Sequence, residues 1–85
     1  MYYVYVLQSS LDKELYVGST NNLRRRLLEH NNGRVFSTSF RKPFTLIYYE
    51  AYKAEDDARI REKMLKLRGQ ARRQLKDRIP KSLLC

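Results

Sequence analysis

The sequence predicts an α+β fold: a small three-stranded antiparallel sheet flanked by helices, in the order β-β-α-β-α-α. Segments 2–8, 14–19 and 44–52 are rich in aromatic and β-branched residues, which is typical of strands. The segments between and after them space their apolar residues as amphipathic helices do. With 85 residues the chain can bury only one sizeable core, so we expect a single domain spanning residues 1–85.

The first two strands are expected to pair as a hairpin. "YYVYVLQ" is apolar on both alternating faces, as in a buried central strand, and "SSLDK" supplies a polar turn before "ELYVGS". Side chains alternate along a strand, so any register with an even-numbered loop brings Tyr5 and Tyr16 to the same face. A register centred between Ser10 and Leu11 would set the two phenols directly opposite each other.

Helices are expected to follow the hairpin and the third strand. Thr20 or Asn21 can cap a helix over 22–31, and "NNG" ends it with residues that tolerate left-handed backbone. A basic loop, "GRVFSTSFRK", then leads through Pro43 to the third strand. The helix over 55–68 has an acidic first turn and a basic end, and after Gly69 "QARRQLKDRI" predicts a last short helix.

Charge and cysteine content narrow the functional classes. There are 18 Lys and Arg residues against 9 Asp and Glu, so the formal charge is +9. A basic chain this short favours an acidic partner, most often nucleic acid. The lone cysteine, Cys85, cannot form an intrachain disulfide, and the N-terminal stretch resembles neither a signal peptide nor a membrane span. We therefore expect a cytoplasmic protein without a membrane partner.

The helix expected after Gly18 carries two basic residues, Arg26 and His30, at the border of its apolar stripe. In projection Leu23 and Leu27 form the core stripe, and Arg26 and His30, one turn apart, border that stripe. Side chains there rise beside the sheet, close to the tyrosine face, whereas Arg25 points to solvent. Basic pairs at this spacing are also common on ordinary surface helices, so the spacing leaves both a phosphate site and a solvated surface open.

Four residues, Gly18, Tyr5, Tyr16 and Glu62, have both a functional and a structural interpretation. Gly18 permits a tight turn and the approach of a bulky ligand. Each tyrosine is by itself as well explained by a core ring with its hydroxyl at the rim. Glu62 borders the apolar arc of its helix, where a carboxylate needs a compensating cation, either a divalent metal or Lys66 one turn later.

Taken together, these motifs resemble the GIY-YIG nuclease domain, and most closely its small single-domain, stand-alone members. "YVY" at 3–5 and "YVG" at 16–18 stand at the two tyrosine-bearing strand motifs, and "RRRLLEH" and "ARIREK" follow in the family's order. Tyr3 replaces the glycine of the first motif. In the segment after the first helix, where many members carry another tyrosine or histidine, this chain has Phe36, Ser37, Thr38 and Phe40.

The resemblance implies a metal-dependent DNA endonuclease with catalytic residues Tyr5, Tyr16, Arg26, His30 and Glu62. Tyr5 would act as general base or orient the water, with Tyr16 helping to hold the nucleophile and phosphate. Arg26 would stabilise phosphate charge, His30 would relay the proton, and Glu62 would bind one Mg²⁺ or Mn²⁺ ion. A tyrosine with a pKa near about 10 needs nearby positive charge to act as a base, while a histidine pKa of about 6.5 suits proton transfer.

Substrate binding is expected to rest on basic groups around this site and to weaken with salt. The expected contacts are Arg24, Arg25, Arg34, Arg41, Lys42, Lys66, Arg68, Arg72 and Arg73. Family members usually add a separate recognition domain, so we expect low sequence specificity, recognition of a DNA structure, or a targeting protein partner. RNA remains a possible substrate, the protein is expected to be a monomer or weak homodimer, and the implied process is DNA repair or recombination.

The rival interpretation is a nucleic-acid-binding module that keeps the fold and lacks nuclease activity. Two observations separate it from the enzyme. The five catalytic candidates must open into one cleft in the enzyme, whereas a Glu62 that points away, or a cleft filled by Phe36 and Phe40, favours the binding module. Tyr48, Tyr49 and Tyr52 on the third strand suit base stacking, although packing at the core and its rim explains them better.

Overall fold

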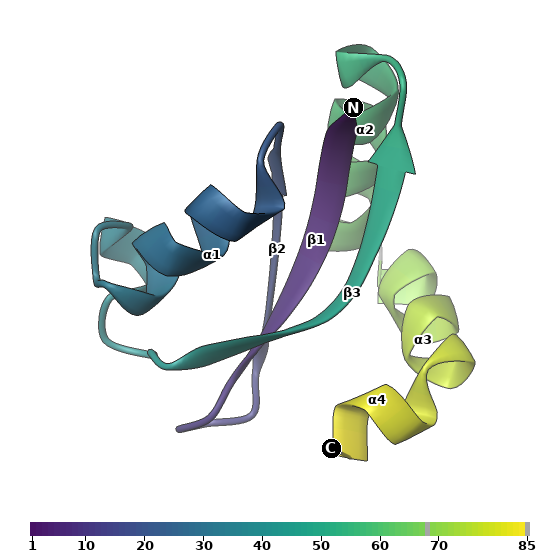
Figure 1. Cartoon of the computed structure of the whole chain (residues 1–85). Coiled ribbons are helices and arrows are strands. Elements are labelled where there is room, and N and C mark those ends of the chain that lie inside the picture. Colours follow the sequence, from purple (N-terminus) through teal and green to yellow (C-terminus); the bar gives the residue numbers. More distant parts are fainter. Residues whose placement is uncertain (68, 85) are drawn as a thin grey trace.

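A computed structural model describes residues 1–67 and 69–84 of the chain. Its three strands are antiparallel in the order β2-β1-β3, with bounds β1 (Tyr2–Ser9), β2 (Leu15–Thr20) and β3 (Phe44–Tyr52) (Figure 1). The helices are α1 (Leu23–Asn31), α2 (Glu55–Leu67), α3 (Gly69–Arg78) and α4 (Pro80–Leu84), with a 3-10 turn η1 at Phe36–Thr38. The predicted α+β class and element order are confirmed, and α4 and η1 are additions to it.

The central strand β1 is buried on both faces, as its continuous apolar sequence predicts. Val4 and Val6 point to the face covered by α2 and α3, where they meet Ala58, Leu65 and Leu75. On the other face Tyr5 and Leu7 form a second cluster with Phe44, against which Leu23 and Leu27 of α1 pack. Figure 1 shows α1 separated from α2 and α3 by the sheet. Two small cores therefore fix the helices on opposite sides of β1.

The hairpin register differs by two residues from the directly opposed arrangement. Tyr5 pairs with Gly18, and Tyr16 pairs with Leu7. The turn extends beyond the assumed centre because the Ser9 hydroxyl accepts hydrogen bonds from the next residues and Lys13 adopts a positive φ of 62°. Tyr5 and Tyr16 consequently share a face, as expected, but lie diagonally, with ring centroids 6.5 Å apart.

Helix α1 is capped by Asn22 and not by Thr20 or Asn21. The Asn22 side-chain oxygen accepts a hydrogen bond from the backbone N–H of Arg25 at 3.0 Å, which satisfies a free donor of the first turn. Thr20 contributes indirectly, since its hydroxyl oxygen accepts from the Asn22 N–H at 3.1 Å. Past the helix end Gly33 has a φ of 75°, as the "NNG" signal predicts.

A partly buried ion pair connects α2 to β3. Arg61 Nε donates to Glu50 Oε1 at 3.0 Å, and the hydroxyls of Tyr48 and Tyr52 donate to the same carboxylate. Burial of Glu50 opposes its ionisation, but these donors hold its pKa below the ordinary value. Tyr48 and Tyr52 are thus engaged in packing at the rim of the core, while Tyr49 is half exposed and packs edge-on against Tyr3.

Leu65 tests the core on the α2 face, because its side chain is fully buried among β-strand valines. Leu65→Ala should lower the free energy of unfolding by about 2–5 kcal/mol in urea denaturation, since it removes buried methyl groups and leaves a cavity. Leu67→Ala, on the same helix but 80% exposed, is the matched control and should change stability by less than about 0.5 kcal/mol. Equal losses in the two variants would contradict this packing.

Candidate active site

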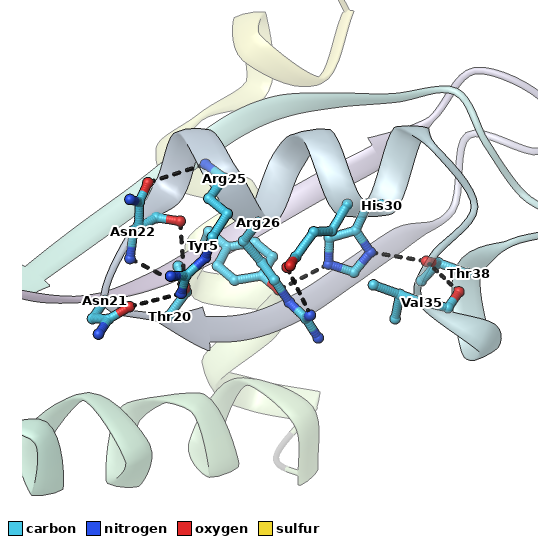
Figure 2. A network of polar contacts seen from close by, with 10 residues as sticks. Tyr5, Thr20, Asn21, Asn22, Arg25, Arg26, His30, Val35 and Thr38 are labelled. Carbon is cyan, nitrogen blue, oxygen red and sulfur yellow. Dashed lines mark hydrogen bonds and ion pairs between the residues drawn. The ribbon is translucent and has the colours of Figure 1, made fainter.

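A chain of hydrogen bonds runs from β1 through α1 into the following loop (Figure 2). The hydroxyl oxygen of Tyr5 lies 2.9 Å from His30 Nε2, and His30 Nδ1 lies 2.8 Å from Thr38 Oγ1. The Thr38 hydroxyl in turn donates to the carbonyl oxygen of Val35 at 3.3 Å. His30 and Thr38 are fully buried and Tyr5 nearly so. Both nitrogens of the imidazole therefore have fixed partners.

These contacts determine which atom carries each proton. Burial raises the pKa of Tyr5 to about 12, above its usual value near 10, although Arg26 opposes the rise. Burial, helped by the charge of Arg26, lowers the pKa of His30 to about 4. At neutral pH both groups are uncharged. Because the Thr38 hydroxyl proton is donated to Val35, Thr38 accepts the proton of Nδ1, and Nε2 is left to accept from the Tyr5 phenol. The phenol proton is thus aimed at a neutral imidazole that can accept it.

Gly18 makes room for the Tyr5 ring. A side chain at position 18 would meet the Tyr5 hydroxyl and ring carbons, because Gly18 is the cross-strand partner of Tyr5. The imidazole itself lies among aromatic rings, with centroids 5.0 Å from Tyr16 and 5.9 Å from Phe44. The sequence therefore positions the Tyr5–His30 pair in two ways. Gly18 on β2 leaves space for the Tyr5 ring, and aromatic rings surround the imidazole in the last turn of α1.

Arg26 lies one turn before His30 and faces an open cavity of about 740 Å³ between α1 and α2. Its guanidinium donates to Glu29 Oε1 at 3.1 Å. The neighbouring Tyr5 hydroxyl is the largest cause of the raised pKa of the Arg26 guanidinium, and Glu29 adds to it. Figure 2 shows the Arg26 side chain beside the Tyr5 ring on the side of α1 that faces the strand. Arg26 thus connects the buried phenol to the cavity.

Glu62 enters the same cavity from α2. Ser19 Oγ donates to Glu62 Oε1 at 2.6 Å, and Lys66 Nζ lies 2.6 Å from Oε2. Burial opposes the ionised form, but these two partners hold the pKa of Glu62 below its usual range. The expected pairing of Glu62 with Lys66 is therefore present, and binding of a divalent metal by this half-buried carboxylate stays a prediction.

The two halves of the site belong to opposite faces of the sheet and meet around its β2 edge. Tyr5, Tyr16 and His30 lie on the α1 face, whereas Glu62 reaches Ser19 from the α2 face. Lys66 spans the edge, since its Nζ lies 5.8 Å from the Tyr16 ring centroid. The charge of Glu62 is close enough to contribute to the raised pKa of Tyr5. The site is consequently continuous across one short edge strand.

The five predicted catalytic residues are therefore neighbours in space, although only Arg26 and Glu62 line the cavity directly. Tyr5, Tyr16 and His30 do not line it and are connected to it through Arg26 and Lys66. Phe36 and Phe40 do not fill the cavity and are strongly exposed. The first criterion for the enzyme is thus met only for Arg26 and Glu62, whereas the second is met in full, because Glu62 points into the cavity and the two phenylalanines leave it open.

The predicted nucleic-acid contacts divide into three groups. Arg25 and Lys66 line the cavity. Arg68 lies outside the described residues, as does Cys85. The others lie away from the cavity, exposed or engaged elsewhere: Arg24 on α1, Arg34 and Lys42 in the loop after it, Arg41 in an ion pair with Asp12, and Arg72 and Arg73 on α3.

Pattern reasoning did not identify several of the polar residues that line the cavity. Ser19, Arg59 and Lys63 line the cavity together with Glu62. The helical spacing of Arg59, Glu62 and Lys66 on α2 was a usable signal, because positions three and four apart share a face. For Ser19 the signal was weaker. It could be found only by knowing that Ser19, like Val17 two residues earlier, lies on the face of β2 that α2 covers.

Three carboxylates line the cavity, but Glu29 and Glu55 pair with Arg26 and Arg59, so a metal would be held by Glu62 and not by a cage of ligands. Among residues 1–67 and 69–84, no group of three or more His, Cys, Asp or Glu side chains is arranged to hold an ion. An ionised carboxylate beside a serine hydroxyl, facing an open cavity, fits a hydrated Mg²⁺ or Mn²⁺ that keeps waters and takes phosphate oxygens as ligands. No described helix is long and apolar enough to cross a membrane.

Comparison with known proteins agrees with this geometry. Residues 1–76 match the model of the GIY-YIG catalytic domain, and the chain belongs to the GIY-YIG family of nuclease domains. It is 40% identical over 67 residues to the UPF0213 protein SpyM50708 of Streptococcus pyogenes serotype M5, covering 78% of this chain and 72% of that protein. The UPF0213 protein SpyM3_1077 of serotype M3 is similar to the same extent. No solved structure matches significantly.

His30 is the only histidine, so its titration can be followed without ambiguity. We expect its ring carbon protons, observed by NMR, to titrate near pH 4. Because the pKa in the folded protein is lower than the unfolded value of about 6.5, the unfolded chain binds the proton first as pH falls. Stability is therefore full above pH 7 and should decrease by about 2 kcal/mol between pH 7 and 5. A midpoint at 6 or above would contradict the neutral, buried imidazole.

Proposed function

We propose that this protein is a metal-dependent endonuclease that hydrolyses phosphodiester bonds in DNA. The observation that supports this most is the convergence of Tyr5, Tyr16, Arg26, His30 and Glu62 around one edge strand. Phosphodiester hydrolysis needs a proton acceptor for water, positive charge against the phosphate and stabilisation of the leaving oxygen. The five side chains supply a group suited to each need.

Tyr5 and His30 form the proton path. Burial raises the pKa of the Tyr5 phenol to about 12 although Arg26 opposes the rise, so the phenol keeps its proton in the resting protein. Tyr5 instead orients the attacking water and passes its own proton to His30 Nε2 as it accepts one from the water. Bound phosphate would add negative charge near the imidazole, which raises its affinity for a proton. Thr38 keeps the accepting nitrogen free by binding the other one.

Arg26 and Tyr16 hold the phosphate. The guanidinium at the cavity wall remains charged at all relevant pH values and has a planar array of donors that suits phosphate oxygens. Tyr16 stacks edge-on against His30, with centroids 5.0 Å apart, and thereby confines the reacting groups on the α1 face. Removing the arginine charge is expected to impair the step in which charge accumulates on the phosphate.

Glu62 would hold a single Mg²⁺ or Mn²⁺, with Ser19 orienting the carboxylate. A bound divalent ion supplies positive charge that stabilises the leaving oxygen of the phosphodiester. Lys66 now pairs with the oxygen of Glu62 that Ser19 leaves free. Lys66 must therefore turn away from Glu62 when the carboxylate binds an ion, and its flexible stem allows it to contact substrate phosphate instead.

Binding is expected to rely on phosphate contacts and not on base readout. Five basic side chains line the cavity: Arg25, Arg26, Arg59, Lys63 and Lys66. Such contacts are salt-sensitive and carry little sequence information, so selectivity would come from DNA structure or from a targeting protein. We further propose that residues 1–85 act as one domain in the cytoplasm, as a monomer or weak homodimer. RNA is a possible second substrate.

A non-catalytic nucleic-acid-binding module is the second candidate. Two observations favour it: the Tyr5 phenol and the His30 imidazole are both uncharged at rest, and Lys66 occupies the carboxylate that the metal needs. This module would bind DNA in a salt-dependent way and show no cleavage with any divalent ion.

The decisive experiment compares wild type with Glu62→Gln on single-stranded, duplex, flap and branched DNA in Mg²⁺ or Mn²⁺, with products resolved on denaturing gels. We expect cleavage by wild type and a loss of at least about 100-fold in the variant, because the only carboxylate held by Ser19 is removed. Tyr5→Phe should lose activity similarly.

Glu55→Gln is the matched control for that experiment, because Glu55 lines the same cavity but pairs with Arg59 on the α2 surface. It removes the same charge and should retain activity within a few-fold. Salt-dependent binding without cleavage by wild type would favour the non-catalytic module instead.

Lys66→Met tests the competition for Glu62. Removing the ammonium group should tighten Mn²⁺ binding, measured by the loss of the free-ion signal in electron paramagnetic resonance, because the ion no longer displaces a lysine. Lys63→Met removes the same charge from the cavity without a contact to Glu62, and should have a smaller effect. Equal tightening in both variants would mean that general electrostatics, not displacement, controls the ion.

A further inference from the structure

We propose that Phe36 and Phe40 form a stacking platform for unpaired nucleobases beside the candidate active site. This inference rests on the proposed function and narrows its substrate class to nucleic acid with an unpaired segment next to the cleaved phosphate. Neither residue belongs to the five that converge at the β2 edge, and neither lines the cavity.

The two phenylalanines are the most exposed large apolar side chains among the residues described. Phe36 is 83% exposed and Phe40 82%. Their ring centroids lie 6.4 Å apart with an interplanar angle of 83°, so the rings pack edge to face and leave aromatic surface open to solvent. Single exposed apolar residues are common, but a pair of aromatic rings in contact on a short loop indicates a binding surface.

The loop that carries them is held in shape by its own hydrogen bonds. The backbone N–H of Thr38 donates to Val35, that of Ser39 to Phe36 and that of Arg41 to Thr38, at 3.0–3.3 Å. The Ser9 hydroxyl of β1 donates to the Arg41 carbonyl at 2.5 Å. A platform formed in advance loses little conformational entropy when a base stacks on it, so its aromatic area is available for affinity.

Thr38 connects this loop directly to the proton path. It lies midway between the two phenylalanines in sequence, and its buried hydroxyl is the partner of His30 Nδ1 at 2.8 Å. Each phenylalanine Cα is two residues from Thr38 and thus within about 7 Å of it. A strand whose phosphate reaches the Tyr5–His30 pair would bring bases a few nucleotides away over these rings.

The surrounding charge selects nucleic acid as the occupant. Arg34 and Lys42 are exposed near the two ends of the same basic loop, and the stretch 33–42 contains no acidic residue. Alternating aromatic and basic groups are typical of single-strand binding surfaces, where rings stack on bases and cations follow the backbone. In a duplex the faces of the bases are covered by their neighbours, so the platform contacts only unpaired bases.

The test measures binding in EDTA, where no cleavage occurs, with a single-stranded DNA that carries 2-aminopurine and the same sequence as a duplex. Stacking on the rings should change 2-aminopurine fluorescence when wild type binds the single strand. Phe36→Ala combined with Phe40→Ala should weaken single-strand binding by about tenfold or more and abolish most of that change. Duplex binding should change by less than about twofold.

Two controls keep the result specific. Leu11→Ala removes another exposed apolar side chain, in the turn between β1 and β2, and should leave both affinities unchanged. Phe40→Tyr keeps the aromatic ring and should retain single-strand binding. Unchanged single-strand affinity in the double alanine variant, or an equal loss for duplex, would overturn the platform; the first outcome would leave a protein partner as the occupant of the two rings.

Failure of the platform and failure of the proposed nuclease remain distinguishable. Metal-dependent cleavage that depends on Glu62, together with no effect of the phenylalanine changes on single-strand binding, would refute only the platform. Selective single-strand binding that depends on the two rings, with no cleavage by wild type under any metal condition, would refute only the nuclease.

Discussion

The hydrogen bond between Tyr5 and His30 is the contact around which the rest of this site is arranged. It joins the central strand to the last turn of α1, and at 2.9 Å it lies entirely within the protein. A buried imidazole must have partners on both nitrogens, because an unpaired polar atom there would cost about 1–3 kcal/mol. Thr38 supplies the second partner, so the loop after α1 is fixed by the same requirement that fixes the histidine.

The edge position of β2 explains how a buried pair reaches an open cavity. A strand with one paired neighbour leaves its outer side free, and Gly18 removes the side chain that would otherwise separate Tyr5 from that side. Helices α1 and α2 approach from opposite faces and deliver Arg26 and Glu62 to the same space. Two cores that hold the helices apart therefore also define the cleft between them.

Much of this arrangement follows from local patterns in the sequence. The alternation in "YYVYVLQ" predicts the central strand, and the helical projection predicts that Arg26 and His30 border the α1 core stripe. The register of the hairpin could not be predicted in the same way, because the hydroxyl of Ser9 and the left-handed Lys13 set the turn. Ser19 and the partner of Arg61 also depend on tertiary contacts, which no short-range pattern encodes.

In the proposed nuclease, the protonation states of Tyr5 and His30 determine how a proton can move through the site. Burial gives Tyr5 a pKa of about 12 and His30 one of about 4, so the pair shares one proton that stays on the phenol. Direct proton transfer from Tyr5 to His30 would be strongly unfavourable, because each unit of difference between their pKa values costs about 1.4 kcal/mol. A path in which the phenol gains one proton as it loses another avoids the free tyrosinate, and phosphate charge near the imidazole reduces the remaining mismatch. Substrate would thus supply part of the electrostatic field that its own hydrolysis requires.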